Sequence, residues 1–241
     1  MKKVLITGAQ SYIGTAVEQW LAKTGNYTVE TVDLKQVRPD EIDFSGIDTV
    51  FHVAGIAHIK ENRENAPLYD QVNHILAVNT ARAAKTGGVK QLILMSSMSV
   101  YGLESGVITK ESRPAPKTHY GKSKYEADTA IEKMRGPAFR VCILRPPMVY
   151  GNGCPGNYQR LRKLALKMPL FPGRQNRRSM IYIENLCGFV ESLIEQERDG
   201  LFFPQNPEYV CTAEMVKYIA QAHHKKISFT GIFNPLLKLG F

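Results

Sequence analysis

The chain has 241 residues, of which 44% are hydrophobic and 22% are charged, and its formal net charge is +9. This composition is typical of a soluble globular protein that is long enough to build a sizeable core. No run of about 18 or more apolar residues occurs, so the sequence predicts no membrane span. Met1-Lys-Lys leads directly into the first apolar run, which leaves no room for a signal peptide. Cys142, Cys154, Cys187 and Cys211 lack C-x-x-C spacing, so we expect reduced thiols of a cytoplasmic protein and no metal site.

The first apolar run opens a turn that is suited to binding a nucleotide. Val4 to Ile6 predict a strand that is buried on both faces, and a helix is predicted from Tyr12 to Lys23. Gly8 lets the backbone of the turn approach a ligand, and Gly14 lets the helix pack closely on the strand. The amides and dipole of the helix N-terminus favour an anion such as a pyrophosphate. The alternative is an ordinary strand–turn–helix unit without a ligand.

Asp33 ends the second apolar run, which starts at Thr28. It follows Gly14 by about 20 residues, where the ribose-binding acid of a dinucleotide-binding fold is expected. The alternative role for Asp33 is to cap the loop that follows it.

Two further strands are predicted to end at the same edge of the sheet. The strand Thr49–Val53 leads into Val53, Ala54 and Gly55, and a long helix is predicted from Pro67 to Lys85. The strand Gln91–Ser96 then brings Ser97 to the same crevice, because ligands bind at the carboxyl ends of parallel strands.

Tyr120 and Lys124 lie four residues apart in a helix that is predicted from Thr118 to Met134, so they share one helix face. If this helix borders a nucleotide site, the lysine charge lowers the pKa of the phenol from about 10 toward the working range. The tyrosine can then exchange a proton with a hydroxyl while hydride moves to or from a nicotinamide. A final strand is predicted from Phe139 to Leu144.

Six segments together resemble the extended short-chain dehydrogenase/reductases of the nucleotide-sugar epimerase/dehydratase family. They are Thr7–Gly14, His52–Gly55, Ser96–Gly102, Tyr120–Lys124, Leu144–Gly151 and Asn176–Ile183, and they occur in family order. The resemblance implies an α/β fold, with a Rossmann-like doubly wound parallel sheet and a small C-terminal substrate lobe. It places an NAD-binding domain over residues 1–150 and the lobe over 151–241, with some C-terminal elements returning to the sheet. Family members are commonly longer, so the lobe is either small or cut short.

The resemblance also implies the site residues and the cofactor, which is NAD. Catalysis falls to Ser97, Tyr120 and Lys124, and the sugar nucleotide contacts Ser97, Asn157 and Arg178. The implied cofactor contacts are Gly8, Ser11, Tyr12, Ile13, Gly14, Asp33, Asp43, Val53, Ala54, Gly55, Tyr120, Lys124 and Pro147. Asp43 would approach the adenine, with a turn as its alternative role. Lys35 and Arg38 leave NADP open, although Asp33 repels a 2′-phosphate. His52, His58 and His74 are expected to pack or hydrogen-bond outside the chemistry.

Two departures from the family pattern affect the expected activity. Ser11 stands where the family usually has a glycine, and its hydroxyl could donate to a phosphate oxygen. Met98 and Ser99 replace the Asp-Glu pair of the sugar dehydratases, which argues against dehydration.

Seven basic residues lie between Asn152 and Ile183 without an intervening acid: Arg160, Arg162, Lys163, Lys167, Arg174, Arg177 and Arg178. These residues could neutralise the pyrophosphate of a nucleotide sugar. The alternatives are that they contact an anionic membrane surface weakly or form a solvated face. No nucleic-acid-binding module is visible, so no nucleic acid is expected as a partner.

Three functions are compatible with these patterns. The first is a 4-epimerase of UDP-hexoses or UDP-N-acetylhexosamines that acts through a 4-keto sugar. The second is a nucleotide-sugar 4-keto-reductase or dehydrogenase for surface polysaccharide synthesis, and the third is a non-catalytic NAD(P)-binding regulator. The intact Ser97, Tyr120 and Lys124 favour an enzyme. Family members often pair through two helices, so the resemblance also implies a homodimer.

Overall fold

The computed structural model describes residues 1–57, 61, 62 and 64–230, which form two compact units. Unit 1 comprises Met1–Pro147 and Ile183–Pro204. Unit 2 comprises Met148–Tyr182 and the residues from Gln205 onward. The chain therefore leaves unit 1 after Pro147, returns to it for one helix and one strand, and then re-enters unit 2.

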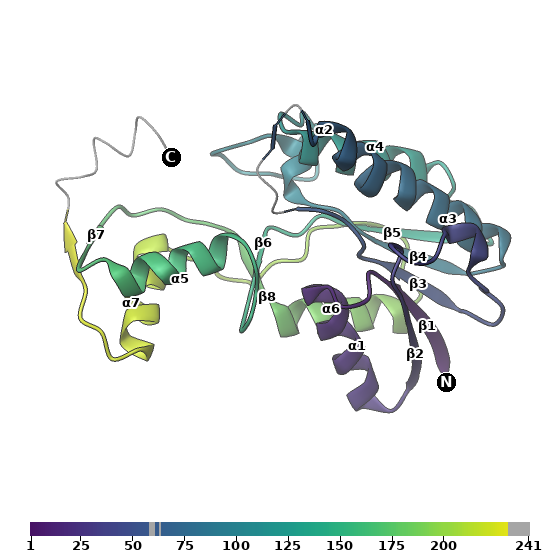
Figure 1. The fold of residues 1–241 in the computed structure, drawn as a ribbon, viewed down its shortest axis with the longest axis horizontal. Helices are drawn as coiled ribbons and strands as arrows, with labels where there is room; N and C mark the ends of the chain where they lie inside the picture. The colour runs from purple at the N-terminus through teal and green to yellow at the C-terminus, as the bar shows by residue number, and fades with distance from the viewer. Residues whose placement is uncertain (58–60, 63, 231–241) are drawn as a thin grey trace. The chain divides into compact units, whose positions relative to one another are not determined.

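Unit 1 is built on a six-stranded parallel sheet in the order β2-β1-β3-β4-β5-β9 (Figure 1). The strands are β1 (Lys2–Thr7), β2 (Tyr27–Val32), β3 (Thr49–His52), β4 (Gln91–Met95), β5 (Arg140–Leu144) and β9 (Gly200–Phe202). The strand order reverses at β1, so a crevice opens where the carboxyl ends of β1 and β3 meet. The predicted doubly wound parallel sheet is confirmed.

Helices cover both faces of this sheet (Figure 1). The helices α1 (Tyr12–Thr24) and α6 (Ile183–Glu195) lie on one face, where Trp20 Nε1 donates to Glu191 Oε2 at 2.7 Å. The helices α3 (Leu76–Thr86) and α4 (His119–Glu132) pack together on the other face. Because both faces are covered, β4 is buried along its whole length.

The long helix that was predicted over Pro67–Lys85 is continuous but changes its winding. It comprises α2 (Ala66–Tyr69), the π-helical turn η2 (Asp70–Ile75) and α3. The π turn carries Asn73, whose fully buried side chain bonds to a neighbouring loop. Single π turns inside helices frequently occur at functional sites. Two short 3₁₀ helices, η1 (Pro39–Glu41) and η3 (Met98–Tyr101), complete unit 1.

Unit 2 is smaller and contains two pairs of parallel strands. The strand β6 (Met148–Tyr150) pairs with β8 (Met180–Tyr182), and β7 (Leu170–Pro172) pairs with β10 (Ser228–Thr230). The helices α5 (Asn157–Lys167) and α7 (Thr212–Ala222) pack through a small cluster around Ala165, Val216 and Ile219. In the described part of the chain, no helix combines the length and apolar character that a bilayer span needs.

Candidate functional site

The turn between β1 and α1 leaves no room for a side chain at Gly8. This glycine has φ +98°, and a Cβ atom there would lie 2.8 Å from the backbone nitrogen of Ala54. The amides of Gly8 and Ala9 donate to the Val32 carbonyl at 3.0 and 3.2 Å. The glycine turn is therefore fixed between the end of β2 and the loop that follows β3, as a close approach of these backbones requires.

The start of α1 is equally tight. Ser11 is the N-cap of this helix, and its Oγ accepts a hydrogen bond from the Gly14 amide at 3.1 Å. Tyr12 and Ile13 begin the first turn, where an α-helix has amides without intrahelical acceptors. Ser11 thus caps the helix where the family has glycine, and its hydroxyl keeps the capacity to donate to an anion.

The two predicted acids both make local turns. Asp33 follows β2 directly, and its Oδ1 accepts from the Lys35 amide at 3.0 Å. Asp43 accepts from the Ser45 amide at 2.9 Å, and its hydrogen bonds to Ser45 lower the pKa of its carboxyl. The alternative roles of capping and turn formation are therefore present for both residues, and contact with ribose or adenine stays a prediction.

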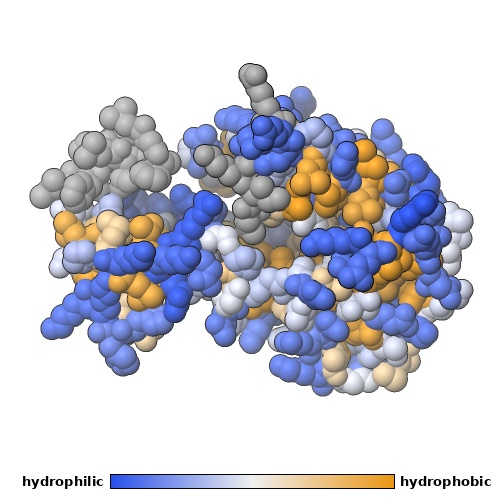
Figure 2. Space-filling model, viewed as in Figure 1, coloured by the Kyte–Doolittle hydropathy of each residue, from blue (hydrophilic) through white to orange (hydrophobic). Residues whose placement is uncertain are grey.

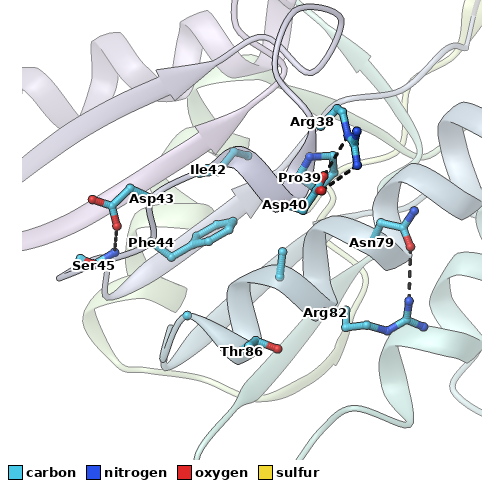
Figure 3. Close-up of a pocket in the computed structure, with 12 residues that line it drawn as sticks. Arg38, Pro39, Asp40, Ile42, Asp43, Phe44, Ser45, Asn79, Arg82 and Thr86 are labelled. Atoms are coloured by element: carbon cyan, nitrogen blue, oxygen red, sulfur yellow. Dashed lines mark hydrogen bonds and ion pairs between the residues drawn. The ribbon is translucent and has the colours of Figure 1, made fainter.

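Asp43 also lines an open pocket of about 810 Å³ between the segment 38–45 and α3 (Figure 3). Its carboxylate is directed toward Ser45, whereas Asn79 and Arg82 of α3 face the pocket from the other side (Figure 3). The pocket lies along the crossover from β2 to β3, in which η1 is the helical element. A full crossover helix is the more common way to cover this side of a doubly wound sheet.

Asn73 anchors the loop after β3, and the sequence analysis missed it. Its Oδ1 accepts from the Ile56 amide at 2.8 Å, and its Nδ2 donates to the Ile56 carbonyl at 3.0 Å and to Ser123 Oγ at 3.2 Å. A Cβ atom on Gly55 would lie 2.8 Å from Asn73 Oδ1 and 3.2 Å from Lys124 Nζ. The predicted cofactor loop Val53–Gly55 therefore lies directly beside the predicted lysine. A polar residue within the apolar stripe of its helix was the signal for this role.

The structure brings Ser97, Tyr120 and Lys124 together at the carboxyl end of β4. Ser97 follows Ser96 at the end of this strand and caps η3, with its Oγ accepting from the Ser99 amide at 3.1 Å. The Ser97 hydroxyl donates to Ser99 Oγ at 3.1 Å, and Ser97 lies close enough to the phenol of Tyr120 to lower its pKa. Lys124 is 5% exposed and donates from Nζ to the Met95 carbonyl at 2.9 Å.

The expected acidification of Tyr120 is not found. Burial raises the pKa of this phenol above 10.0, and the nearby Ser97 side chain only partly opposes the rise. Burial also lowers the pKa of Lys124 to about 8, which the charge of Asp128 opposes. The prediction that Lys124 lowers the pKa of Tyr120 is therefore wrong for this structure, because desolvation dominates for both groups.

A carboxylate that the sequence analysis missed holds the start of α4. Glu61 accepts from the backbone amides of His119 and Tyr120, at 3.0 Å each. A negative charge at a helix N-terminus complements the helix dipole. Glu61 is far from both residues in sequence, so no local pattern could have indicated this contact.

His52 and His74 make hydrogen bonds, as expected. His52 Nδ1 lies 2.8 Å from Thr7 Oγ1 between β3 and β1, and burial lowers the pKa of the ring to about 3. His74 pairs with Asp70 at 2.8 Å, and Glu126 lies 3.7 Å from the same ring nitrogen. Asp70, His74 and Glu126 form the group in the described chain whose ligand atoms lie close enough together to hold a metal ion. None of the four cysteines belongs to this group, and all four are free and buried. His58 lies outside the described residues.

In unit 2 the two predicted substrate residues line one pocket of about 170 Å³. Asn157 begins α5, and Arg178 forms a two-way backbone bridge with Val210, at 2.9 Å in each direction. The exposed Arg178 also borders a second pocket of about 390 Å³, with Leu164 and Phe171. Pro147 ends unit 1, next to Pro146, whose carbonyl accepts from the Met98 amide at 3.1 Å.

Comparison with protein families and curated sequences gives consistent matches. A model described as the NAD dependent epimerase/dehydratase family matches residues 4–201. A UDP-glucose 4-epimerase from Vibrio cholerae is 30% identical over 251 residues, covering 93% of this chain and 76% of the relative. An N-acetyl-alpha-D-glucosaminyl-diphospho-ditrans,octacis-undecaprenol 4-epimerase from Escherichia coli O157:H7 is 27% identical, covering 98% of this chain and 77% of the relative.

Solved structures share the fold. A UDP-glucuronic acid 4-epimerase from Bacillus cereus in complex with NAD matches with a TM-score of 0.82 at 20% identity, covering 95% of this chain and 85% of that structure. A dTDP-4-dehydrorhamnose reductase from Clostridium acetobutylicum matches with a TM-score of 0.80 at 21% identity, with coverages of 95% and 82%. At these identities the likeness shows the fold alone.

Proposed function

Because the chain belongs to the NAD-dependent epimerase/dehydratase family, we propose that it is a nucleotide-sugar 4-epimerase that uses NAD and acts through a 4-keto sugar. One observation carries the proposal. Ser97, Tyr120 and Lys124 meet at the carboxyl end of the sheet, beside the Gly55 loop. In parallel sheets of this kind, ligands bind at that edge.

The glycine turn fits a dinucleotide. A side chain is excluded at Gly8, and the first turn of α1 offers amides and a positive dipole end to a pyrophosphate. Asp33 would bind the ribose hydroxyls, and Lys124 would hold the nicotinamide ribose. Tyr12, Ile13, the loop Val53–Gly55, Asp43 and Pro147 complete the proposed cofactor site.

The proposed chemistry assigns one role to each catalytic side chain. NAD, when bound, would supply the acceptor and donor of the hydride. Tyr120 takes the proton of the C4 hydroxyl during oxidation and gives it back during reduction. Ser97 donates a hydrogen bond to the oxygen that becomes the ketone, and the ammonium of Lys124 would donate to the nicotinamide ribose.

The proposed substrate is linked to UDP, in line with the name of the Vibrio cholerae relative, whereas the Escherichia coli relative is named for an undecaprenol-linked sugar. Arg178 and Asn157 line one pocket of unit 2, and an arginine is well suited to a diphosphate. A 4-keto-reductase is the alternative, because the same three side chains can serve a single reduction. A non-catalytic regulator fits poorly with three intact catalytic side chains.

Two further proposals concern surfaces and location. Apolar residues lie over the helices of unit 1 (Figure 2), where Leu68 is 40% exposed and Ile75 is 45% exposed. They support a homodimer that pairs through these helices.

The basic residues of α5, which include Arg160 and Lys163, are compatible with weak contact with an anionic membrane surface. A cytoplasmic location stays a prediction.

The decisive experiment incubates the purified protein with UDP-glucose and with UDP-N-acetylglucosamine, with and without NADH, and identifies the products. An epimerase interconverts the 4-epimers without net oxidation of NADH. A keto-reductase consumes NADH in proportion to its product when a 4-keto sugar nucleotide is supplied. If neither reaction occurs, the proposed activity is refuted for these substrates.

A matched pair of variants tests the role of Tyr120. Tyr120→Phe should lower turnover by at least about a hundredfold while NAD binding is retained, because only the phenolic hydroxyl is removed. Tyr125→Phe, on the same helix, should keep the wild-type rate. Equal rates for the two variants would refute the assigned role.

A further inference from the structure

A buried group of charges lies behind the catalytic tyrosine. The helix α4 carries Tyr120, Lys124 and Asp128 at intervals of four residues, which places them along one stripe of the helix. Lys124 is 5% exposed, Asp128 is 2% exposed, and Arg145, which follows β5, is 7% exposed. Burying three charged groups side by side is costly unless they compensate one another.

The carboxylate of Asp128 is the centre of this group. Its Oδ2 accepts from Arg145 Nε at 2.9 Å and from Ser96 Oγ at 2.9 Å. Arg145 in turn donates from Nη1 to the Tyr101 hydroxyl at 2.8 Å and lies 5.3 Å from the centre of that ring. One side chain of α4 therefore ties the helix to the ends of β4 and β5 and to η3.

Ser96 links this arrangement to the catalytic serine, because it precedes Ser97 in the chain. The Ser96 amide also donates to the Leu144 carbonyl at 2.7 Å. Both the backbone and the hydroxyl of Ser96 are thus held, so the position of Ser97 depends on Asp128.

The charge of Asp128 also affects the pKa of Lys124. Burial raises the pKa of Asp128 to about 6, with Arg145 and Ser96 opposing the rise, so the carboxylate is ionised at pH 7. The remaining oxygen, Oδ1, is buried and has no hydrogen-bond partner among the described residues. The negative charge of Asp128 raises the pKa of Lys124 and so acts against the effect of burial.

The other groups around Lys124 do not supply this charge. His52 of β3 is buried and neutral at pH 7, since burial lowers its pKa to about 3. Tyr69 of α2 packs edge-on against Tyr120, with ring centres 6.3 Å apart, and burial raises the pKa of both phenols. Arg145 is a cation and supplies no negative charge. Among these groups, Asp128 is the one whose charge raises the pKa of Lys124.

We propose that Asp128 is a positioning residue for the catalytic site: it fixes Ser97 through Ser96 and keeps the ammonium of Lys124 charged, with Arg145 as its structural counterion. This inference rests on the proposed roles of Tyr120, Ser97 and Lys124. It adds a fourth side chain, which touches neither substrate nor cofactor, to the machinery of the reaction.

The first test needs no activity. NMR titration of the ligand-free protein with ¹³C-labelled lysine follows Lys124, whose signal is assigned by its loss in Lys124→Arg. In the wild type the Lys124 signal should show a second inflection near pH 6, where Asp128 titrates. Absence of that inflection overturns the charge coupling, whatever sugar the enzyme uses.

A matched pair of variants sharpens the test. Asp128→Asn keeps the shape and removes the charge, and it should move the Lys124 midpoint to lower pH by at least about half a unit. Glu126→Gln removes an exposed charge from the same helix and should leave the midpoint unchanged. An unchanged midpoint in folded Asp128→Asn overturns the proposal.

Measurements of turnover distinguish the positioning role of Asp128 from its effect on the charge of Lys124. Ser96→Ala removes the hydroxyl that binds Asp128 without changing any charge, so it should lower kcat several-fold, leave KM near the wild-type value and leave the Lys124 midpoint in place. Asp128→Glu should recover part of the activity that Asp128→Asn loses. Wild-type kcat in Ser96→Ala would overturn the positioning role. If the wild type itself shows no epimerase or reductase activity, the proposed function fails while the titration still decides the coupling.

Discussion

Ser11 and Gly14 lie so close at the start of α1 that no carbon atom fits between them. A Cβ atom on Gly14 would lie 2.6 Å from Ser11 Oγ and 2.9 Å from the Gly8 carbonyl oxygen. The serine that replaces a family glycine is therefore accommodated because Gly14 has no side chain. The nucleotide turn and the helix cap form one tightly packed unit.

Gly14→Ala should disrupt this unit, because the added methyl group meets backbone as well as a side chain. We expect the free energy of unfolding to fall by about 1–3 kcal/mol. NAD affinity should fall by roughly tenfold or more, since the first turn of α1 must shift. Urea unfolding and NAD titration measure the two effects.

Gly188→Ala is the matched control, because it is also a helical glycine. Among the described residues its Cβ would meet Trp20 alone, at 3.5 Å, which is ordinary contact. Replacing glycine inside a helix should leave stability unchanged or raise it by about 0.5–1 kcal/mol. Similar losses in both variants would contradict the tight packing at Gly14.

The pH dependence of turnover should report Lys124. Its buried ammonium has a pKa of about 8, and the reaction needs the charged form, so kcat should decline as the pH rises above about 8. Lys124→Arg keeps its charge throughout and should lose this alkaline decline while turning over more slowly. If both enzymes lose activity at the same alkaline pH, another group controls it.

His52 should contribute to acid unfolding. The folded pKa is about 3 against 6.5 for an ordinary histidine, so the unfolded chain takes up a proton that the folded chain refuses. Stability from this group is therefore complete above about pH 6.5 and falls as the pH drops toward 3, by about 1.4 kcal/mol per pH unit.

His52→Asn can retain a bond to Thr7 and should remove this slope. The folded pKa of Asp128 is raised to about 6, so this group stabilises the folded protein increasingly as the pH falls from about 6 to 3.8, in the opposite direction to His52. Both the wild type and the variant contain Asp128, so its contribution is the same in the two proteins. Urea unfolding of wild type and variant at several pH values isolates the His52 effect. Parallel curves would show that His52 does not titrate on unfolding.

Arg178 should bind the diphosphate of the substrate. Arg178→Ala should raise KM for the sugar nucleotide by roughly tenfold or more with little change in kcat, because binding to a remote phosphate is lost. The neighbouring Arg177 lies 4.8 Å from the centre of the Tyr209 ring and serves as the control. A comparable rise in KM for Arg177→Ala would indicate a general basic surface.

The sequence was most informative where chemistry and local geometry coincide. The run Val4–Ile6, the glycine turn and the helix carrying Tyr120 could be predicted because each depends on neighbours in the chain. Four-residue spacing likewise put Tyr120 and Lys124 on one face. The predicted strands end within one or two residues of the observed positions.

The remaining parts of the site depend on contacts between distant segments. Glu61 reaches α4 from another loop, and Arg145 meets Asp128 from the end of β5. The pKa of Tyr120 was predicted wrongly because the spacing in a helix reveals a neighbouring charge but not the burial of the phenol. Desolvation is a property of the folded surroundings.

The π-helical turn η2 holds one residue more than an α-helical turn would, so the number of residues in the helix before α3 matters. Deleting one residue between Asp70 and Ile75 would let this turn return to ordinary α-helical winding, which leaves the flanking segments in nearly the same orientation but changes the directions of the side chains within the turn. Asn73 lies within the turn and would then lose its hydrogen bonds to Ile56. An insertion or deletion in this apparently plain helix should therefore be as damaging to the cofactor loop as a change within the loop itself.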